Sequence, residues 1–190
     1  ARSPPRSQNQ SPRASTRTLT RRGKTGEMLG FMKYPRMGLT IWSYAYRWRR
    51  APKEKRFRDV LRVLDHCAEL RAGGLQVGVG GWRGDFAGKV RERREKLGLF
   101  LEGQVALPKD VGDLPRFEAD LAAGREAGAT VFRAVCLGGR RYETFSSSED
   151  WDAFRKRSRR SLRLAEKVAA KRKVKLAIEN HKDWRVPELL

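Results

Sequence analysis

The residues best suited to chemistry lie at the end of a short apolar run at positions 174–184, which reads V-K-L-A-I-E-N-H-K-D-W. Its first eight residues are typical of a buried strand, on which successive side chains point to opposite faces. The alternation puts Glu179 and His181 on one face and Leu176 and Ile178 on the other. In α/β proteins the carboxyl end of a parallel strand is where ligands and metals bind. The alternative is a strand that simply ends in polar loop residues.

Strand and helix patterns alternate along the chain that leads to this run. Period-two patterns predict five strands, at residues 37–45, 75–79, 99–107, 130–137 and 174–181. Helical spacing of apolar residues predicts four helices, at about residues 57–68, 86–97, 114–127 and 151–169. We expect Gly73 and Gly74 to end the first helix, and Asp113 to cap the third. Strict alternation of strand and helix predicts an α/β fold with a parallel sheet.

The polar residues of the strands favour a barrel over an open sheet. One face of each predicted strand is aliphatic, and the other carries the polar and aromatic residues Thr40, Trp42, Gln76, Glu102, Gln104, Arg133, Glu179 and His181. An open sheet covered by helices on both sides favours apolar residues on both faces. A shared polar face suits the interior and mouth of a (βα)8 TIM barrel, which needs about 250 residues. We therefore expect residues 36–190 to be the N-terminal part of such a barrel, incomplete at its C-terminus.

The charge is concentrated before the predicted barrel. The chain has a formal net charge of +21, and residues 1–56 hold 15 Lys or Arg against Glu27 and Glu54. Residues 1–35 mix Arg with Ser, Pro, Thr and Gln and offer little to bury, so we expect a disordered basic tail. Such a tail can attract phosphate backbones or anionic surfaces, although it does not by itself make a nucleic-acid reader.

The sequence contains no export signal and no membrane span. Arg21 and Arg22 form an arginine pair, but no apolar run of about 7 to 15 residues follows them. No stretch approaches the roughly 18 apolar residues that cross a bilayer. Cys67 and Cys136 lie in apolar surroundings, where a reduced thiol acts as a small core residue. We expect a cytoplasmic protein with no membrane partner.

Five segments carry a resemblance to a known family. They read M-G-L-T-I-W-S-Y, L-D-H-C-A-E-L-x-A-G-G-L-Q-V-G-V, R-F-E-A-D-L-A-A, G-R-R-Y-E-T-F and L-A-I-E-N-H-K-D-W. Together they resemble the sugar phosphate isomerase/epimerase family of xylose isomerase-like TIM barrels, a superfamily that also includes endonuclease IV. The resemblance spans about residues 37–190. It implies a (βα)8 barrel with one divalent metal ion (Mn, Mg, Co or Zn) at its mouth, held by a Glu, an Asp, a His and a second Glu.

The resemblance assigns the first of these metal ligands to Glu179 and places the other three beyond Leu190. The implied reaction removes a proton next to a sugar carbonyl through an enediolate, which the ion stabilises. Glu179 would be both metal ligand and catalytic acid or base. The chain as it stands is then expected to be inactive.

Five further residues are candidates for binding the sugar. His181 shares the face of Glu179, and its alternative is a loop-end histidine with no role. Arg133 interrupts an apolar strand, so it either meets a substrate oxygen or pairs with Glu102. The remaining candidates are Lys109, Arg141 and Tyr142, which lie in loops after predicted strands, where loops supply specificity. The alternative is that these three are solvated loop residues.

Two other functions fit parts of the sequence. A metal-dependent endonuclease would suit the basic charge, but it needs many ligands and the chain has only His66 and His181. A non-catalytic nucleic-acid binder could use the basic tail. We expect a small-molecule sugar as the partner and not nucleic acid. An incomplete barrel leaves apolar sheet edges unpaired, so we also expect poor solubility or a homo-oligomer.

Overall fold

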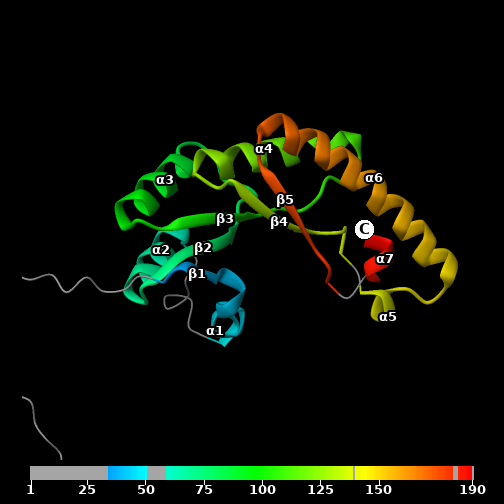
Figure 1. Ribbon diagram of the computed structural model, residues 1–190, viewed down its shortest axis with the longest axis horizontal. Coiled ribbons are helices and arrows are strands. Elements are labelled where there is room, and N and C mark those ends of the chain that lie inside the picture. The colour runs from blue at the N-terminus through cyan, green and yellow to red at the C-terminus, as the bar shows by residue number, and fades with distance from the viewer. Residues whose placement is uncertain (1–33, 51–58, 139, 182–183, 190) are drawn as a thin grey trace, which may run out of the picture. The chain divides into compact units, whose positions relative to one another are not determined.

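A computed structural model of the protein describes residues 34–50, 59–138, 140–181 and 184–189 (Figure 1). Within these residues five strands form one sheet in the order β1-β2-β3-β4-β5, and every pairing is parallel. The strands are β1 (Tyr34–Thr40), β2 (Ala72–Gly78), β3 (Phe100–Gln104), β4 (Val131–Val135) and β5 (Lys175–Glu179). The predicted α/β fold with a parallel sheet is confirmed. The predicted basic tail lies outside the described residues, except that β1 begins at Tyr34.

Four helices connect the strands and cover one face of the sheet (Figure 1). They are α2 (Val60–Glu69), α3 (Phe86–Leu97), α4 (Leu114–Glu126) and α6 (Ser148–Arg172). Shorter helical segments lie between them and at the ends: η1 (Ile41–Tyr44), α1 (Ala45–Arg50), η3 (Val111–Asp113), α5 (Arg141–Thr144) and α7 (Val186–Leu189). Among the described residues no helix is both long enough and apolar enough to cross a membrane.

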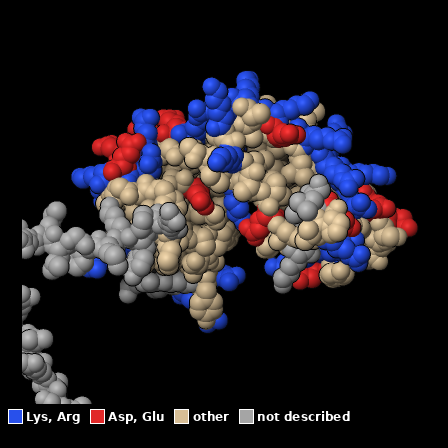
Figure 2. Space-filling model, viewed as in Figure 1, with Lys and Arg blue, Asp and Glu red and all other residues tan. Residues whose placement is uncertain are grey.

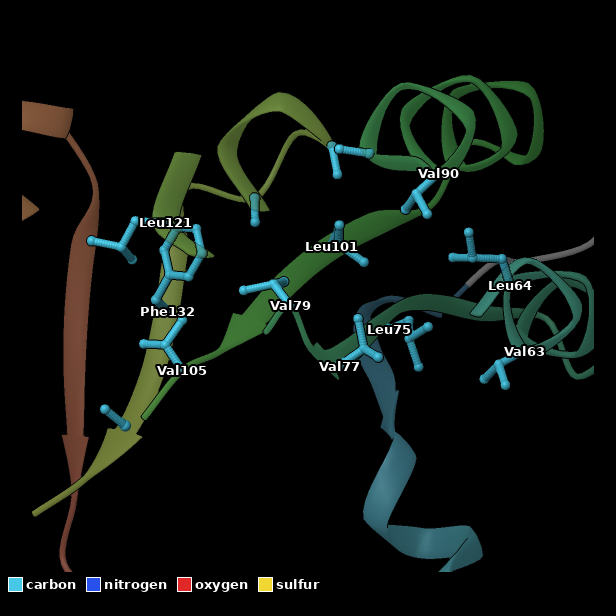
Figure 3. Close-up of a cluster of buried hydrophobic side chains, with 14 of the residues drawn as sticks. Val63, Leu64, Leu75, Val77, Val79, Val90, Leu101, Val105, Leu121 and Phe132 are labelled. Carbon is cyan, nitrogen blue, oxygen red and sulfur yellow. The ribbon is translucent and has the colours of Figure 1, made fainter. Parts of the chain in front are cut away.

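The hydrophobic core lies between this helical layer and the apolar face of the sheet (Figure 3). Leu75, Leu101 and Phe132 contribute side chains from three adjacent strands, and Leu64 and Leu121 meet them from α2 and α4. All five are almost fully buried. The predicted strand faces are therefore correct, because every second residue of β2, β3 and β4 points into the core.

The longest helix also follows its predicted pattern. The side chains of Trp151, Phe154, Ala165 and Ala169 are buried on one side of α6, as their spacing predicts. Ser147 caps the helix, because its hydroxyl oxygen accepts a hydrogen bond from the backbone N–H of Asp150 at 3.1 Å.

Asp113 lies at the predicted cap position of α4, but its side chain does not make the predicted cap hydrogen bond. It accepts hydrogen bonds from Arg116 at 2.8 Å and from the backbone N–H of Lys109 at 3.0 Å. The nearby guanidinium is a stronger donor than a backbone amide, and it takes the carboxylate instead.

The first strand is shorter than predicted. It ends at Thr40, and residues 41–45 turn into η1 and α1 although Ile41 and Trp42 are common in strands. The indole N–H of Trp42 donates a hydrogen bond to Gln104 at 2.6 Å, and this contact holds the chain curled over the end of the sheet. β3, β4 and β5 are also shorter at both ends than predicted, and the predicted loop after β4 contains α5.

The glycine pair predicted to end the first helix belongs to β2. The helix ends at Glu69, Leu70 is its C-cap, and Arg71 makes the turn with a φ of 58°. Gly74 lies opposite Phe100 in the sheet, and a Cβ atom at Gly74 would collide with the ring and the carbonyl oxygen of Phe100. The glycine is needed because a ring occupies the place of its side chain.

This close approach predicts a large difference between two glycines of the same strand. We expect Gly74→Ala to lower the free energy of unfolding by about 1 to 3 kcal/mol, as overpacking does. A Cβ atom at Gly78 would meet no atom within 4 Å, so Gly78→Ala should change stability by less than about 1 kcal/mol. Urea denaturation of both variants measures the difference, and equal losses would contradict this account of β2.

Candidate functional site

The face of the sheet opposite the helices carries a row of residues set by strand register. Gly78 pairs with Gln104, Gln104 pairs with Arg133, and Arg133 pairs with Ala177. The row runs from β2 to β5. It lies at the carboxyl ends of β2 and β3 and in the middle of β4 and β5. Gln104 and Arg133 therefore lie side by side, flanked by two residues with little or no side chain.

Three side chains form hydrogen bonds with Gln104. Its amide nitrogen donates to Gln76 at 2.7 Å and to Thr40 at 3.3 Å, and its amide oxygen accepts the indole N–H of Trp42 at 2.6 Å. Gln76 in turn donates to Glu102 at 3.0 Å. Gln104 is only 9% exposed, and a satisfied network around a buried amide holds its members in fixed orientations.

Arg133 and Glu179 form an ion pair beside this network. Glu179 lies opposite Val135, two residues beyond Ala177, so it is the diagonal neighbour of Arg133 across β4 and β5. The Nε of Arg133 donates a hydrogen bond to Oε2 of Glu179. The side chains are 24% and 42% exposed, so both reach solvent. Glu102 is not the partner of Arg133, because Glu102 accepts the hydrogen bond of Gln76.

The ion pair fixes the charge state of Glu179. The hydrogen bond from Arg133 lowers the pKa of the Glu179 carboxyl, and the charge of His181 lowers it further. The same hydrogen bond raises the pKa of Arg133. Glu179 is therefore ionised at neutral pH and can accept hydrogen bonds. As a proton acceptor it is weak for as long as Arg133 holds it, because basicity falls with pKa.

Open space adjoins the two polar groups. A Cβ atom at Gly78 would meet nothing within 4 Å, so the volume beside Gln104 is free on that side. On the other side of Arg133, Ala177 is exposed and presents only a methyl group. Gln104 and Arg133 are therefore flanked on this face by two positions without a large side chain.

The other predicted site residues lie in different surroundings. His181 follows β5 and is exposed, near enough to Glu179 to affect its charge. Lys109 is exposed before η3, where its backbone N–H bonds Asp113. Tyr142 is exposed in α5, with 82% of its surface accessible. The structure thus brings together Arg133, Glu179 and His181, and shows no contact of Lys109 or Tyr142 with them.

Arg141 is engaged in a contact within the fold. Its guanidinium donates to Glu188 of α7 at 2.7 Å and lies over the ring of Trp151, 4.2 Å from the ring centre. Asn180 makes a second link in this region, since its amide donates to the backbone oxygen of Trp184 at 2.7 Å. The charge of Arg141 is therefore balanced inside the protein.

Sequence reasoning placed Thr40, Trp42, Gln76 and Gln104 on the polar face but did not name them as site residues. The signal that could have identified them is that all four fall on the same face of their predicted strands. The importance of Gly78 was not visible in the sequence, because it depends on which residue of β3 lies opposite.

A complete metal centre does not fit the residues at this site. In the described part of the chain, no three His, Cys, Asp or Glu side chains are grouped so that they could hold a metal ion. Glu179 offers one carboxylate, and that carboxylate is bound to Arg133. Among the described residues, the polar face offers hydrogen bonds and one ion pair.

Comparison with known proteins adds no assignment. No protein-family model matches the chain, and no curated protein matches it significantly. The resemblance to sugar phosphate isomerases and epimerases stays a prediction, and function is inferred from the geometry of the polar face.

The ion pair predicts a shift that titration can measure. In Arg133→Gln we expect the pKa of Glu179 to rise toward the ordinary glutamate value, because its main hydrogen-bond donor and nearest positive charge are gone. NMR detection of the side-chain carboxyl carbons follows this directly. Glu188, whose pKa is lowered by Arg141, serves as the internal control and should not move.

The same pair affects stability in a defined pH window. A carboxyl with a lowered folded-state pKa stabilises the fold at neutral pH and loses that contribution as the pH falls through the lowered pKa. As the pH is lowered through this window, the free energy of unfolding of the Arg133→Gln variant should therefore fall less than that of the unmodified protein. An unchanged pKa of Glu179 in the variant would show that Arg133 does not hold it in solution.

Proposed function

We propose that this protein is an isomerase or epimerase of a sugar or sugar derivative, and that the polar face of its sheet binds the sugar. The observation that carries the proposal is the ion pair between Arg133, in the middle of β4, and Glu179, at the carboxyl end of β5, beside the Gln104 network. Ligands of parallel α/β folds bind at this end of the strands.

The side chains around the open space match the chemistry of a sugar. Each hydroxyl of a sugar both donates and accepts a hydrogen bond. The amides of Gln76 and Gln104 offer both functions, Glu179 accepts, and Arg133 donates. Trp42 stands at the edge with 61% of its surface exposed, so its ring offers a flat apolar surface to the C–H face of a sugar.

The ion pair suggests how a proton could be moved. The guanidinium of Arg133 would turn to the carbonyl oxygen of a bound sugar and stabilise the negative charge of the enediolate as it forms. Glu179, released from Arg133, would regain basicity and take the proton from the carbon next to the carbonyl. Return of that proton from Glu179 to the neighbouring carbon, with the hydroxyl proton passing to the former carbonyl oxygen, gives the isomer. An epimer forms when solvent water protonates the opposite face of the original carbon and Glu179 gives its proton to solvent.

The proposal also includes a barrel fold and a metal cofactor. Five parallel strands with helices on one face and polar residues on the other are compatible with part of a xylose isomerase-like (βα)8 barrel. A divalent ion at Glu179 would need ligands from outside the described residues, so no step is assigned to it. In this proposal the protein works in the cytoplasm, where the buried thiols of Cys67 and Cys136 stay reduced.

Hydrogen exchange with solvent tests the reaction. A chain restored to the full length of the expected barrel is incubated in D2O with a panel of aldoses and ketoses, with and without a phosphate group, and with each of Mn, Mg, Co and Zn in turn. We expect deuterium at the carbon next to the carbonyl of one sugar, and at least about a 1,000-fold slower exchange in Glu179→Gln, since general bases contribute about 100-fold to 10,000-fold. Glu166→Gln, on the exposed surface of α6, is the control and should exchange normally. Equal rates in both variants would remove Glu179 from the reaction.

Filling the open space tests the binding site separately. Gly78→Leu places a side chain where a Cβ atom meets nothing within 4 Å, so the variant should fold normally and bind the sugar at least about 10-fold more weakly. Gly78→Ala, which fills little of the space, should bind nearly as well as the unmodified protein. Calorimetric titration measures all three. Undiminished binding by Gly78→Leu would place the sugar elsewhere.

A further inference from the structure

The outward surface of α6 carries four basic residues in a line. Lys156, Arg160, Arg163 and Lys167 recur at spacings of four, three and four residues, which puts them on one side of a helix, and all four are exposed. At about 1.5 Å of rise per residue the line is about 16 Å long. We call these four residues the basic stripe.

The basic stripe is not neutralised within the described part of the chain. Three other basic residues of α6 have acidic partners: Arg155 pairs with Asp152 at 3.0 Å, and Lys171 and Arg172 pair with Glu118 at 3.4 and 2.9 Å. No salt bridge involves the four residues of the stripe in the ranges that the structure describes. Like charges at this spacing repel and destabilise a helix, so a bound anion would relieve a strain that the fold leaves in place.

The stripe lines a shallow hollow. Its four residues, with Arg159 and Leu164, surround a volume of about 360 Å³ that is open to solvent. Figure 2 shows Lys and Arg side chains gathered along α6. The surface faces away from the sheet, because the opposite side of α6 is buried in the core through Trp151 and Ala165. Binding there does not depend on the sugar site.

The chemistry of the hollow indicates its partner. Guanidinium groups bind phosphate oxygens in pairs, and several cations in a row match a chain of phosphates. A lipid surface is a poorer fit, because interfacial helices insert an apolar face and α6 has its own buried in the core, with Leu164 the single apolar residue lining the hollow. A single nucleic-acid strand is also a poorer fit, because no aromatic side chain lines the hollow for bases to stack on.

We propose that the basic stripe of α6 binds the phosphate backbone of double-stranded DNA without reading its bases. The N-terminal tail is one surface that the sequence suggested for nucleic-acid contact, and the stripe is a second surface, on a helix of the fold. Each phosphate neutralised by the stripe releases a condensed counterion, so the binding is strongly weakened by salt.

The test compares two variants of the full chain that lose the same charge. One replaces the stripe (K156Q/R160Q/R163Q/K167Q), and the other replaces exposed basic residues elsewhere (R83Q/R91Q/K96Q/R125Q). The N-terminal tail is intact in both. Binding of a 20-base-pair DNA duplex is measured by fluorescence anisotropy from 50 to 200 mM salt. Circular dichroism confirms that both variants fold, as Gln is a good helix former.

We expect the stripe variant to bind at least about 10-fold more weakly at 50 mM salt. The slope of log affinity against log salt should fall by about 0.9 for each phosphate that the variant no longer neutralises, or about 3 to 4 for the whole stripe. In the control variant the same slope should fall by less than about 0.9. An equal decrease of the slope in both variants, or no decrease in the stripe variant, would overturn the proposal.

Two further binding measurements distinguish double-stranded DNA from single-stranded DNA and from a lipid surface. The unmodified protein should bind the duplex more tightly than a single strand of the same length, and it should bind phosphatidylserine vesicles with an affinity that the stripe variant retains. Tighter binding of the single strand, or vesicle binding that disappears with the stripe while duplex binding is kept, would overturn the proposal. So would the absence of duplex binding by the unmodified protein.

Discussion

The packing of one ring sets the geometry on both faces of the sheet. Phe132 of β4 is fully buried, and Cβ atoms at Gly103 of β3 and Gly124 of α4 would both collide with its ring. The ring therefore fits only where β3 and α4 have no side chain. Gly103 pairs with Phe132, and this register is what places Gln104 beside Arg133 on the other face. A slip by one residue would reverse the faces of the strand, so the packing of the core determines the layout of the polar site.

The main polar side chains of this face are hydrogen-bonded to one another before any ligand arrives. Gln104 shares hydrogen bonds with its neighbours, and Arg133 is held by Glu179. A ligand must therefore exchange hydrogen bonds with the site and gains only the difference. This favours ligands that can replace several bonds at once and disfavours apolar ones, because a displaced amide or guanidinium that is left unpaired costs about 1 to 3 kcal/mol. Selectivity for a molecule with many hydroxyl groups follows from this exchange.

Periodic features of the sequence predicted most of the fold. The period of two in the strands and the helical stripe of α6 were correct because each reflects burial of one face by the elements around it. The errors have non-local causes. Gly74 was assigned to a turn because nothing in the local sequence reveals the ring of Phe100 against it, and η1 follows from the bond of Trp42 to Gln104, which is 62 residues away. Glu179 was found from its position at a strand end, whereas its partner Arg133 follows from a diagonal contact that only the register defines.

The order of the strands in space is the same as their order along the chain. Each new strand finds its partner in the strand made just before it, and the intervening helix is already available to cover the new pair. Loop closures are short as a result, and short closures favour fast assembly. On a ribosome the sheet can grow at one edge at the pace of synthesis, from β1 to β5, with no strand waiting for a partner that has yet to emerge. Among the described strands β1 would then be the template, and the joining of β5 would bring Glu179 to Arg133.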